Sequence, residues 1–103
     1  MILHIAQFTW KPEVTEEDVV ALTAALLGMA AQIPAIRSYT AGTNLRLRPS
    51  ATDYAVAAIV DDEEGLAAYL DHPLHAAVYE QHLGWMIADR AAAQLPIEAG
   101  SPS

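Results

Sequence analysis

Two segments of this chain, residues 1–10 and 54–60, have the pattern of β-strands that are apolar on both faces. In the first segment both alternating sets of side chains are largely apolar, with Ala6 and Phe8 in one set and Ile5 in the other. A half-exposed strand alternates apolar and polar residues, so this pattern is typical of a strand covered on both sides. The chain must therefore fold so that both faces of its sheet are covered.

The apolar content of the chain strengthens this constraint. Of the 103 residues, 53% are hydrophobic and 17% are charged, whereas soluble domains are usually about 45–50% apolar and about 25% charged. A chain of this length buries only about 60–70% of the surface that its unfolded form exposes. We therefore expect an internal apolar cavity, a face buried against a second copy of the chain, or both.

The charge balance and the cysteine count exclude several classes of partner and chemistry. Thirteen acidic residues against five basic ones give a formal charge of −8, which disfavours nucleic acid and anionic membranes as partners. The absence of cysteine excludes a disulfide framework, a thiolate zinc site and a cysteine nucleophile, and it fits a reducing cytoplasm. The sequence shows no signal peptide and no apolar run of membrane-spanning length. We expect a soluble cytoplasmic protein.

The order of the expected elements defines the fold class. Thr15 offers an N-cap, and acidic residues follow it, so a helix is expected to begin at residue 16. The full set of expected elements is strand 1–10, helix 16–32, strand 36–48 around a bulge or close approach at Gly42, a turn-rich link 48–53, strand 54–60, helix 63–70, helix 74–88 bent or interrupted near Gly84, and strand 90–97. The Ala-rich start of the last segment also favours continuation of the helix, since Ala is the best helix former.

This order, β-α-β-β-α-α-β, predicts an α+β ferredoxin-like fold with a four-stranded antiparallel sheet and helices on one face. Two such sheets packed face to face would form a dimeric α+β barrel, which covers the second apolar face. We expect one domain over residues 1–97 and a flexible C-terminal tail over residues 98–103.

Proton-exchanging side chains gather in the segment Tyr69-Leu70-Asp71-His72-Pro73-Leu74-His75. Pro73 suits the first turn of a helix, and in a regular helix Tyr79 and His82 follow His75 on the same stripe. A stripe of His and Tyr where a core stripe would normally carry Leu indicates a candidate site.

Several short motifs together resemble the stress-responsive A/B barrel domain (Dabb) family. They are His4 within His-Ile-Ala-Gln-Phe, Ile33-Pro34-Ala35-Ile36, Gly42-Thr43-Asn44, Asp53-Tyr54 and, above all, Tyr69-(x)2-His72-Pro73-(x)-His75. The likeness runs from residue 2 to about residue 97. It implies a small dimeric α+β barrel, and many such proteins are stress-induced or uncharacterised. One plant member is a polyketide cyclase that works by an aldol reaction without metal or cofactor.

The resemblance implies roles for individual residues. The catalytic histidine and tyrosine of the cyclase match His75 and Tyr69, and a pocket histidine of its first strand matches His4; a further pocket histidine falls near Val56. His75 would then be a general base and Tyr69 the donor to an oxyanion. We place His4, Phe8, Val56 and His72 at the substrate. The structural alternatives are a capping or loop-bonding role for His75, local hydrogen bonds for His72 just before the helix, and a core position for Tyr69 and His4.

Three classes of function follow from this interpretation. The first is a homodimer that binds a small apolar oxygenated metabolite and acts on it as a cofactor-free polyketide cyclase or lyase. The second is a stress-responsive binding dimer without catalysis. The third is a cofactor-free monooxygenase that uses Trp85 and the histidines. A metal site formed by His72, His75 and His82 is disfavoured because no carboxylate shares their stripe, so we expect neither metal nor cofactor.

Overall fold

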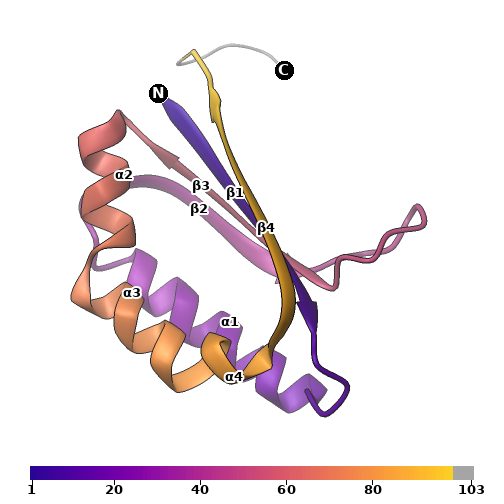
Figure 1. The fold of residues 1–103 in the computed structure, drawn as a ribbon. Coiled ribbons are helices and arrows are strands. Elements are labelled where there is room, and N and C mark those ends of the chain that lie inside the picture. The colour runs from indigo at the N-terminus through magenta and orange to yellow at the C-terminus, as the bar shows by residue number, and fades with distance from the viewer. Residues whose placement is uncertain (99–103) are drawn as a thin grey trace.

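The computed structural model describes residues 1–98 and contains one four-stranded sheet with its helices on one side (Figure 1). The strands are β1 (Ile2–Trp10), β2 (Ile36–Thr43), β3 (Tyr54–Val60) and β4 (Ile87–Pro96). The helices are α1 (Glu16–Ala30), α2 (Glu63–Leu70), α3 (Pro73–Val78), the π-helical segment η1 (Tyr79–Leu83) and the short α4 (Gly84–Met86). Within these residues, none of the helices combines the length and apolarity needed to cross a membrane.

The sheet confirms the predicted fold class. Its strand order is β2-β3-β1-β4, and all neighbouring strands are antiparallel. This is the ferredoxin-like arrangement, in which the first strand lies in the middle of the sheet and the last strand pairs with it at the edge. We call the face that the helices cover the inner face and the opposite one the outer face. The predicted tail falls almost wholly on residues 99–103, outside the described part of the chain.

Helix α1 begins where the sequence predicts, because Thr15 caps it. The Thr15 hydroxyl accepts a hydrogen bond from the Asp18 amide at 3.2 Å, and the Asp18 carboxylate accepts one from the Thr15 amide at 2.9 Å. This reciprocal capping satisfies two amides that the helix leaves free. Leu22, Leu26 and Met29 then pack against the inner face of the sheet and form the core with residues from β1 and β3.

The predicted helix 74–88 is interrupted near Gly84, as expected, but its end is wrong. It is split into α3, η1 and α4, and the chain is already extended at Ile87, so β4 begins three residues earlier than expected. In η1 the Gly84 amide donates to the Tyr79 carbonyl, five residues back. The predicted stripe of His72, His75, Tyr79 and His82 therefore loses its regular helical spacing after Tyr79, because this turn contains an extra residue.

The second strand is also shorter than predicted. Strand β2 pairs with β3 only as far as Thr43, not to residue 48. After it the Asn44 side chain accepts a hydrogen bond from the Arg46 amide at 2.9 Å, and Arg46 has a φ of 54°. A left-handed residue after such an Asn turn cannot continue a ladder. The sheet irregularity lies between Ile36 and Ser38, not at Gly42, which pairs normally with Ala55.

The Ala-rich run before Pro96 forms a strand, as we predicted, although Ala favours helix. Residues 91–93 pair with β1 over the register Gln7↔Ala91 to Ile5↔Ala93. Ladder hydrogen bonds to the central strand decide the conformation here, because tertiary context overrides a weak local propensity.

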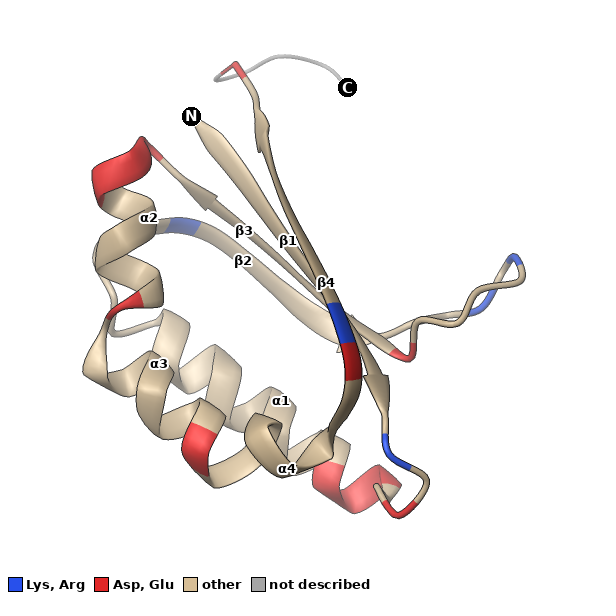
Figure 2. Ribbon diagram, viewed as in Figure 1, with Lys and Arg blue, Asp and Glu red and all other residues tan. Residues whose placement is uncertain are grey.

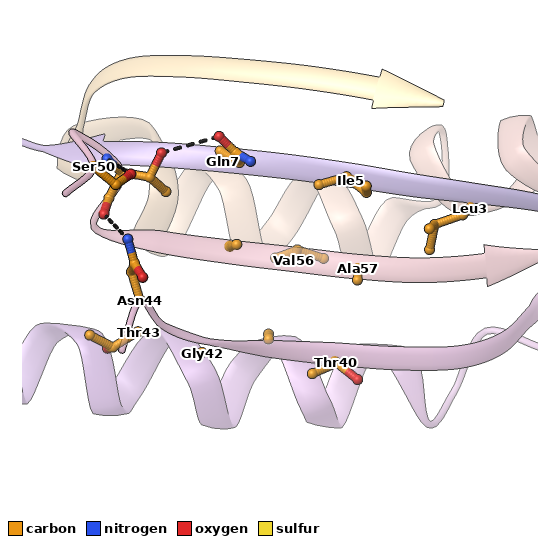
Figure 3. Close-up of a pocket in the computed structure, with 13 residues that line it drawn as sticks. Leu3, Ile5, Gln7, Thr40, Gly42, Thr43, Asn44, Ser50, Val56 and Ala57 are labelled. Carbon is orange, nitrogen blue, oxygen red and sulfur yellow. Dashed lines mark hydrogen bonds between the residues drawn. The ribbon is translucent and has the colours of Figure 1, made fainter. Parts of the chain in front are cut away.

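The outer face of the sheet has apolar and small side chains at its centre, beside polar ones such as Gln7 and Thr40. Leu3 and Ile5 of β1 lie beside Ala57 of β3, and Gly42 of β2 completes an open hollow of about 460 Å³ (Figure 3). Neither β1 nor β3 contains a charged residue, as Figure 2 also shows. The two-faced apolar pattern in the sequence therefore corresponds to an inner face under the helices and an outer face that the monomer leaves open.

Candidate functional site

A cavity of about 160 Å³ lies between the inner face of the sheet and the helices. Both layers around it contribute polar side chains: His4, Tyr39, Arg90 and Gln94 come from the sheet, and Tyr69, His75 and Tyr79 come from the helices. Apolar side chains that include Phe8, Val56 and Leu26 complete the wall. A small number of polar groups in an otherwise apolar enclosure is the usual composition of a small-molecule site.

Tyr69 is the centre of the polar lining. The centroid of its ring lies 5.9 Å from that of His4 and 5.3 Å from that of His75, and each pair meets edge to face. The Tyr39 ring approaches Tyr69 from another side, with centroids 6.1 Å apart. Two imidazoles and two phenols therefore surround one small volume.

Different elements bring these side chains together. His4 lies on β1 and points to the inner face, where its side chain is 6% exposed. Tyr69 is the last but one residue of α2 and is 3% exposed. His75 lies in α3, which Pro73 starts at its first position. Residues Asp71 and His72 separate α2 from α3. The change in chain direction at this break brings Tyr69 and His75 into contact over the sheet.

The hydrogen bond of His4 defines its tautomer. The Gln94 amide nitrogen lies 3.0 Å from His4 Nδ1, and a side-chain amide nitrogen can only donate. His4 Nδ1 is therefore an acceptor, which leaves the hydrogen of the neutral ring on Nε2. Gln94 is opposite His4 in the β1–β4 register, so this cross-strand pair orients the imidazole.

Both cavity imidazoles are held in their neutral form. Burial lowers the pKa of His4 below its ordinary value of 6.5, and the charges of His75 and Arg90 lower it further. Burial also lowers the pKa of His75, with Arg90 adding to the effect and Asp71 opposing it. A neutral imidazole can accept a proton, so at neutral pH either ring is available as a base.

The two tyrosines are held protonated. Burial raises the pKa of Tyr69, and burial together with the nearby Tyr69 raises the pKa of Tyr39. Within residues 1–98, the Tyr39 hydroxyl is buried and has no hydrogen-bond partner of regular geometry, although the Tyr69 hydroxyl lies close enough to affect its pKa. A phenol that stays protonated and is short of partners can donate to a ligand oxygen.

The lowered imidazole pKa values predict a pH dependence of stability. Between the lowered pKa values and 6.5 the unfolded chain binds more protons than the folded one, so the free energy of unfolding should fall as the pH falls below 6.5. Urea unfolding between pH 7.5 and 5.5 measures this slope. The slope should be smaller in His75→Asn, which removes one of the two groups; an equal slope in both proteins would contradict the assignment.

The structure brings five of the six sequence-predicted site residues to this cavity, namely His4, Phe8, Val56, Tyr69 and His75. His72 is elsewhere. It is the N-cap of α3, and its Nδ1 accepts a hydrogen bond from the Leu74 amide at 3.0 Å, which is the structural alternative considered for it. His82, which lies within the π-helical segment η1, does not line the cavity either.

Three polar lining residues were missed in the sequence, namely Tyr39, Arg90 and Gln94. Arg90 and Gln94 could have been identified from the register of β4 on β1, because Gln94 is opposite His4 and Arg90 is opposite Phe8. Residues opposite each other in a sheet project to the same face. The register could not be assigned without the start of β4, which was predicted at residue 90 instead of 87.

The π-helical segment η1 shapes one wall of the cavity through Tyr79 and Leu83. The Tyr79 ring packs over Gly84, where a Cβ atom would lie 3.3 Å from the ring and 3.1 Å from the Tyr79 carbonyl oxygen. Glycine at this position therefore lets the ring lie close to the backbone. Within the described residues, no three His, Asp or Glu side chains are grouped so that they could hold a metal ion.

These features define a class of protein, the ferredoxin-like α+β domains that enclose a pocket between a four-stranded sheet and its helices. The chain belongs to the Stress responsive A/B Barrel Domain family (Dabb), whose model matches residues 2–95. This confirms the resemblance seen in the sequence motifs.

Known proteins similar to this chain agree with the family assignment. It is 33% identical over 94 residues to an uncharacterised protein of Streptomyces coelicolor, with 86% of this chain and 97% of that protein covered. A dimeric ferredoxin-like protein of unknown function from Thermobifida fusca is 40% identical, with a TM-score of 0.86 over 93% of this chain and 90% of that one. A hydroxynitrile lyase from Passiflora edulis has a TM-score of 0.81 over 98% and 96% of the chains; its 12% identity shows a shared fold alone.

Proposed function

We propose that the cavity binds a small apolar oxygenated metabolite and that His75 and Tyr69 perform acid–base chemistry on it without a metal or cofactor. The observation that carries the proposal is the edge-to-face contact of a neutral imidazole and a protonated phenol, 5.3 Å between centroids, on the wall of an apolar cavity. A base and an oxyanion donor at this separation can contact two neighbouring atoms of one ligand.

The proposed step is the removal of a proton from carbon next to a carbonyl group. The proton moves to the neutral His75 ring, and the electron pair of the C–H bond moves into an enolate whose oxygen accepts a hydrogen bond from the Tyr69 hydroxyl. The enolate carbon then attacks a second carbonyl carbon of the same ligand, and the imidazolium returns the proton to the alkoxide that forms. This sequence is an intramolecular aldol reaction, the chemistry of a polyketide cyclase; its reverse cleaves a carbon–carbon bond, as in a lyase.

The size of the cavity limits the ligand. Its volume of about 160 Å³ is close to that of an engineered apolar cavity of about 150 Å³ that holds benzene. A single ring, or an open chain of similar size, fits the enclosed part. The apolar Phe8 and Val56 would contact the hydrocarbon part of the ligand, and the polar groups its oxygen atoms.

The other two functional classes differ in their support. A binding dimer without catalysis uses the same cavity, and only a kinetic measurement separates it from the cyclase or lyase. A monooxygenase that uses Trp85 has no support from the geometry, because the Trp85 side chain is 42% exposed and does not line the cavity.

We also propose that the functional unit is a homodimer with the two outer faces in contact. The central small residues Gly42 and Ala57 form a hollow, and the flanking Ile5 and Leu95 are apolar. An open apolar face of this kind is typical of a subunit interface. The similar Thermobifida fusca protein is described as dimeric, which supports the proposal.

The connection between β2 and β3 supports the same assembly. This segment projects from the sheet on the side opposite the helices (Figure 1). It carries Leu45 and Leu47, which are 81% and 76% exposed. We propose that these two leucines contact the partner subunit at the edge of the interface.

Proton exchange tests the catalytic proposal without knowledge of the natural substrate. Acetophenone and phenylacetone carry exchangeable hydrogens next to a carbonyl and are of suitable size. The protein is expected to accelerate the replacement of these hydrogens by deuterium in D₂O near neutral pH, measured by the loss of the ¹H NMR signal. Binding of both ketones, seen as shifts of His75 resonances, with exchange no faster than in buffer, would leave only the binding function.

A further inference from the structure

Arg90 occupies a distinctive place at the cavity. It lies on the edge strand β4, opposite Phe8 in the register with β1, and therefore on the inner face. It lines the cavity together with His4 and His75, and it is at the same time exposed to solvent. Its charge affects both imidazoles, as the lowering of their pKa values shows.

Arg90 is also free of the ion pairs that engage other arginines. Arg37 pairs with Asp61, and Arg46 pairs with Asp53. The guanidinium of Arg90 forms no salt bridge within residues 1–98; the Asp89 carboxylate accepts a hydrogen bond from its backbone amide instead. None of the lining residues is acidic. A chain with a formal charge of −8 thus places an unpaired cation, and no anion, on the wall of its cavity.

We propose that the ligands of this cavity are small organic acids whose carboxylate binds Arg90 while their apolar body lies over His4, Tyr69 and Phe8. The guanidinium is suited to this role because its planar donors match the two oxygens of a carboxylate. This inference rests on the proposed function, since it names the chemical class of ligand for the same site.

A carboxylate at Arg90 also has a consequence for the base. The anion offsets the positive charge that faces His75, so the bound ligand raises the proton affinity of that imidazole. Linkage requires the reverse effect as well: protonation of His75 strengthens binding of the acid. Acid binding and proton abstraction therefore support each other at this site.

Matched pairs of acids and amides test the inference. Benzoate with benzamide, and phenylacetate with phenylacetamide, differ in charge but hardly in shape. We expect each acid to bind at least about tenfold more tightly than its amide, in chemical-shift titrations at low salt. Arg90→Gln is expected to remove this preference by weakening acid binding and leaving amide binding unchanged. Arg90→Lys, which keeps the charge, should retain part of the preference.

The control variant is Arg48→Gln, which removes the same charge from the exposed connection between β2 and β3 and should leave all four affinities unchanged. Equal binding of acids and amides to the unaltered protein would overturn the inference and leave the proposed binding function intact. Undiminished acid binding in Arg90→Gln would overturn the role of Arg90. If none of the four compounds binds at millimolar concentration, the inference fails, and binding of the two ketones decides separately on the proposed function.

Discussion

Replacing His75 with Ala is expected to slow deuterium exchange into acetophenone by about 10²–10⁴-fold, because general-base catalysis contributes effects of this size. Affinity for the ketone should change little, since proton transfer is felt mainly in the transition state. The measurement is the exchange rate by ¹H NMR at saturating and at low ketone concentration, which separates turnover from binding.

The companion variant is Tyr69→Phe, which keeps the ring in the core and removes only the hydroxyl group. Its exchange rate should fall because the enolate oxygen loses a donor, while its thermal stability stays near that of the unaltered protein. A structural role for His75 gives a different result. His75→Ala would then lower the melting temperature by several degrees, as a loss of about 1–2 kcal/mol does in a domain of this size. A stable, ketone-binding His75→Ala variant with undiminished exchange would eliminate the mechanism.

Replacing Ala57 with Asp is expected to convert the proposed dimer to monomers at micromolar concentration. Ala57 lies on β3 between Ile5 and Thr40 in the sheet register and faces the open hollow of the outer face (Figure 3). In a two-fold assembly the new carboxylate appears twice, without a cation in β1 or β3 to pair with it. If the two carboxylates weaken the free energy of dimerisation by about 4 kcal/mol, the Kd of the dimer rises about a thousandfold.

Ala24→Asp is the matched control, because it makes the same change on the exposed surface of α1, on the other side of the sheet. Light scattering should give a dimer mass for the unaltered protein and for this control, and a monomer mass for Ala57→Asp. A monomeric mass for the unaltered protein would contradict the proposed assembly. Leu45 and Leu47 can then be tested in the same way as edge contacts.

The fold class could be predicted because its signals are local. Apolar residues in both alternating sets marked β1 and β3 as strands covered on two sides, and Thr15 as an N-cap followed by acidic residues marked the start of α1. A break near Gly84 was expected, but the π-helical form of the turn and the early end of β2 could not be predicted, since they depend on contacts between elements. The π-helical turn before Gly84 is accompanied by packing of the Tyr79 ring on that glycine, and the end of β2 at Thr43 depends on how the Asn44 turn meets Asp53.

The candidate site also has residues that could be predicted from the sequence and residues that could not. Tyr69 and His75 are six residues apart, and the turn between their helices is encoded locally by Asp71, His72 and Pro73, so the sequence could indicate them together. His4 could be placed on their side of the sheet only through strand parity and the family resemblance. Arg90 and Gln94 lie more than eighty residues from β1 positions with which they share a face, as the register Phe8↔Arg90 and His4↔Gln94 shows.

The sequence by itself determined the antiparallel α+β sandwich, the apolar character of both sheet faces and the supply of imidazole and phenol groups, because each follows from spacing and composition along the chain. Tertiary structure alone decided which of these groups share a cavity and what charge they face. Strand register places Gln94 beside His4 and Arg90 beside Phe8, and burial under the helices keeps both imidazoles neutral. Desolvation and cross-strand contact are properties of the packed molecule, so no pattern along the chain contains them.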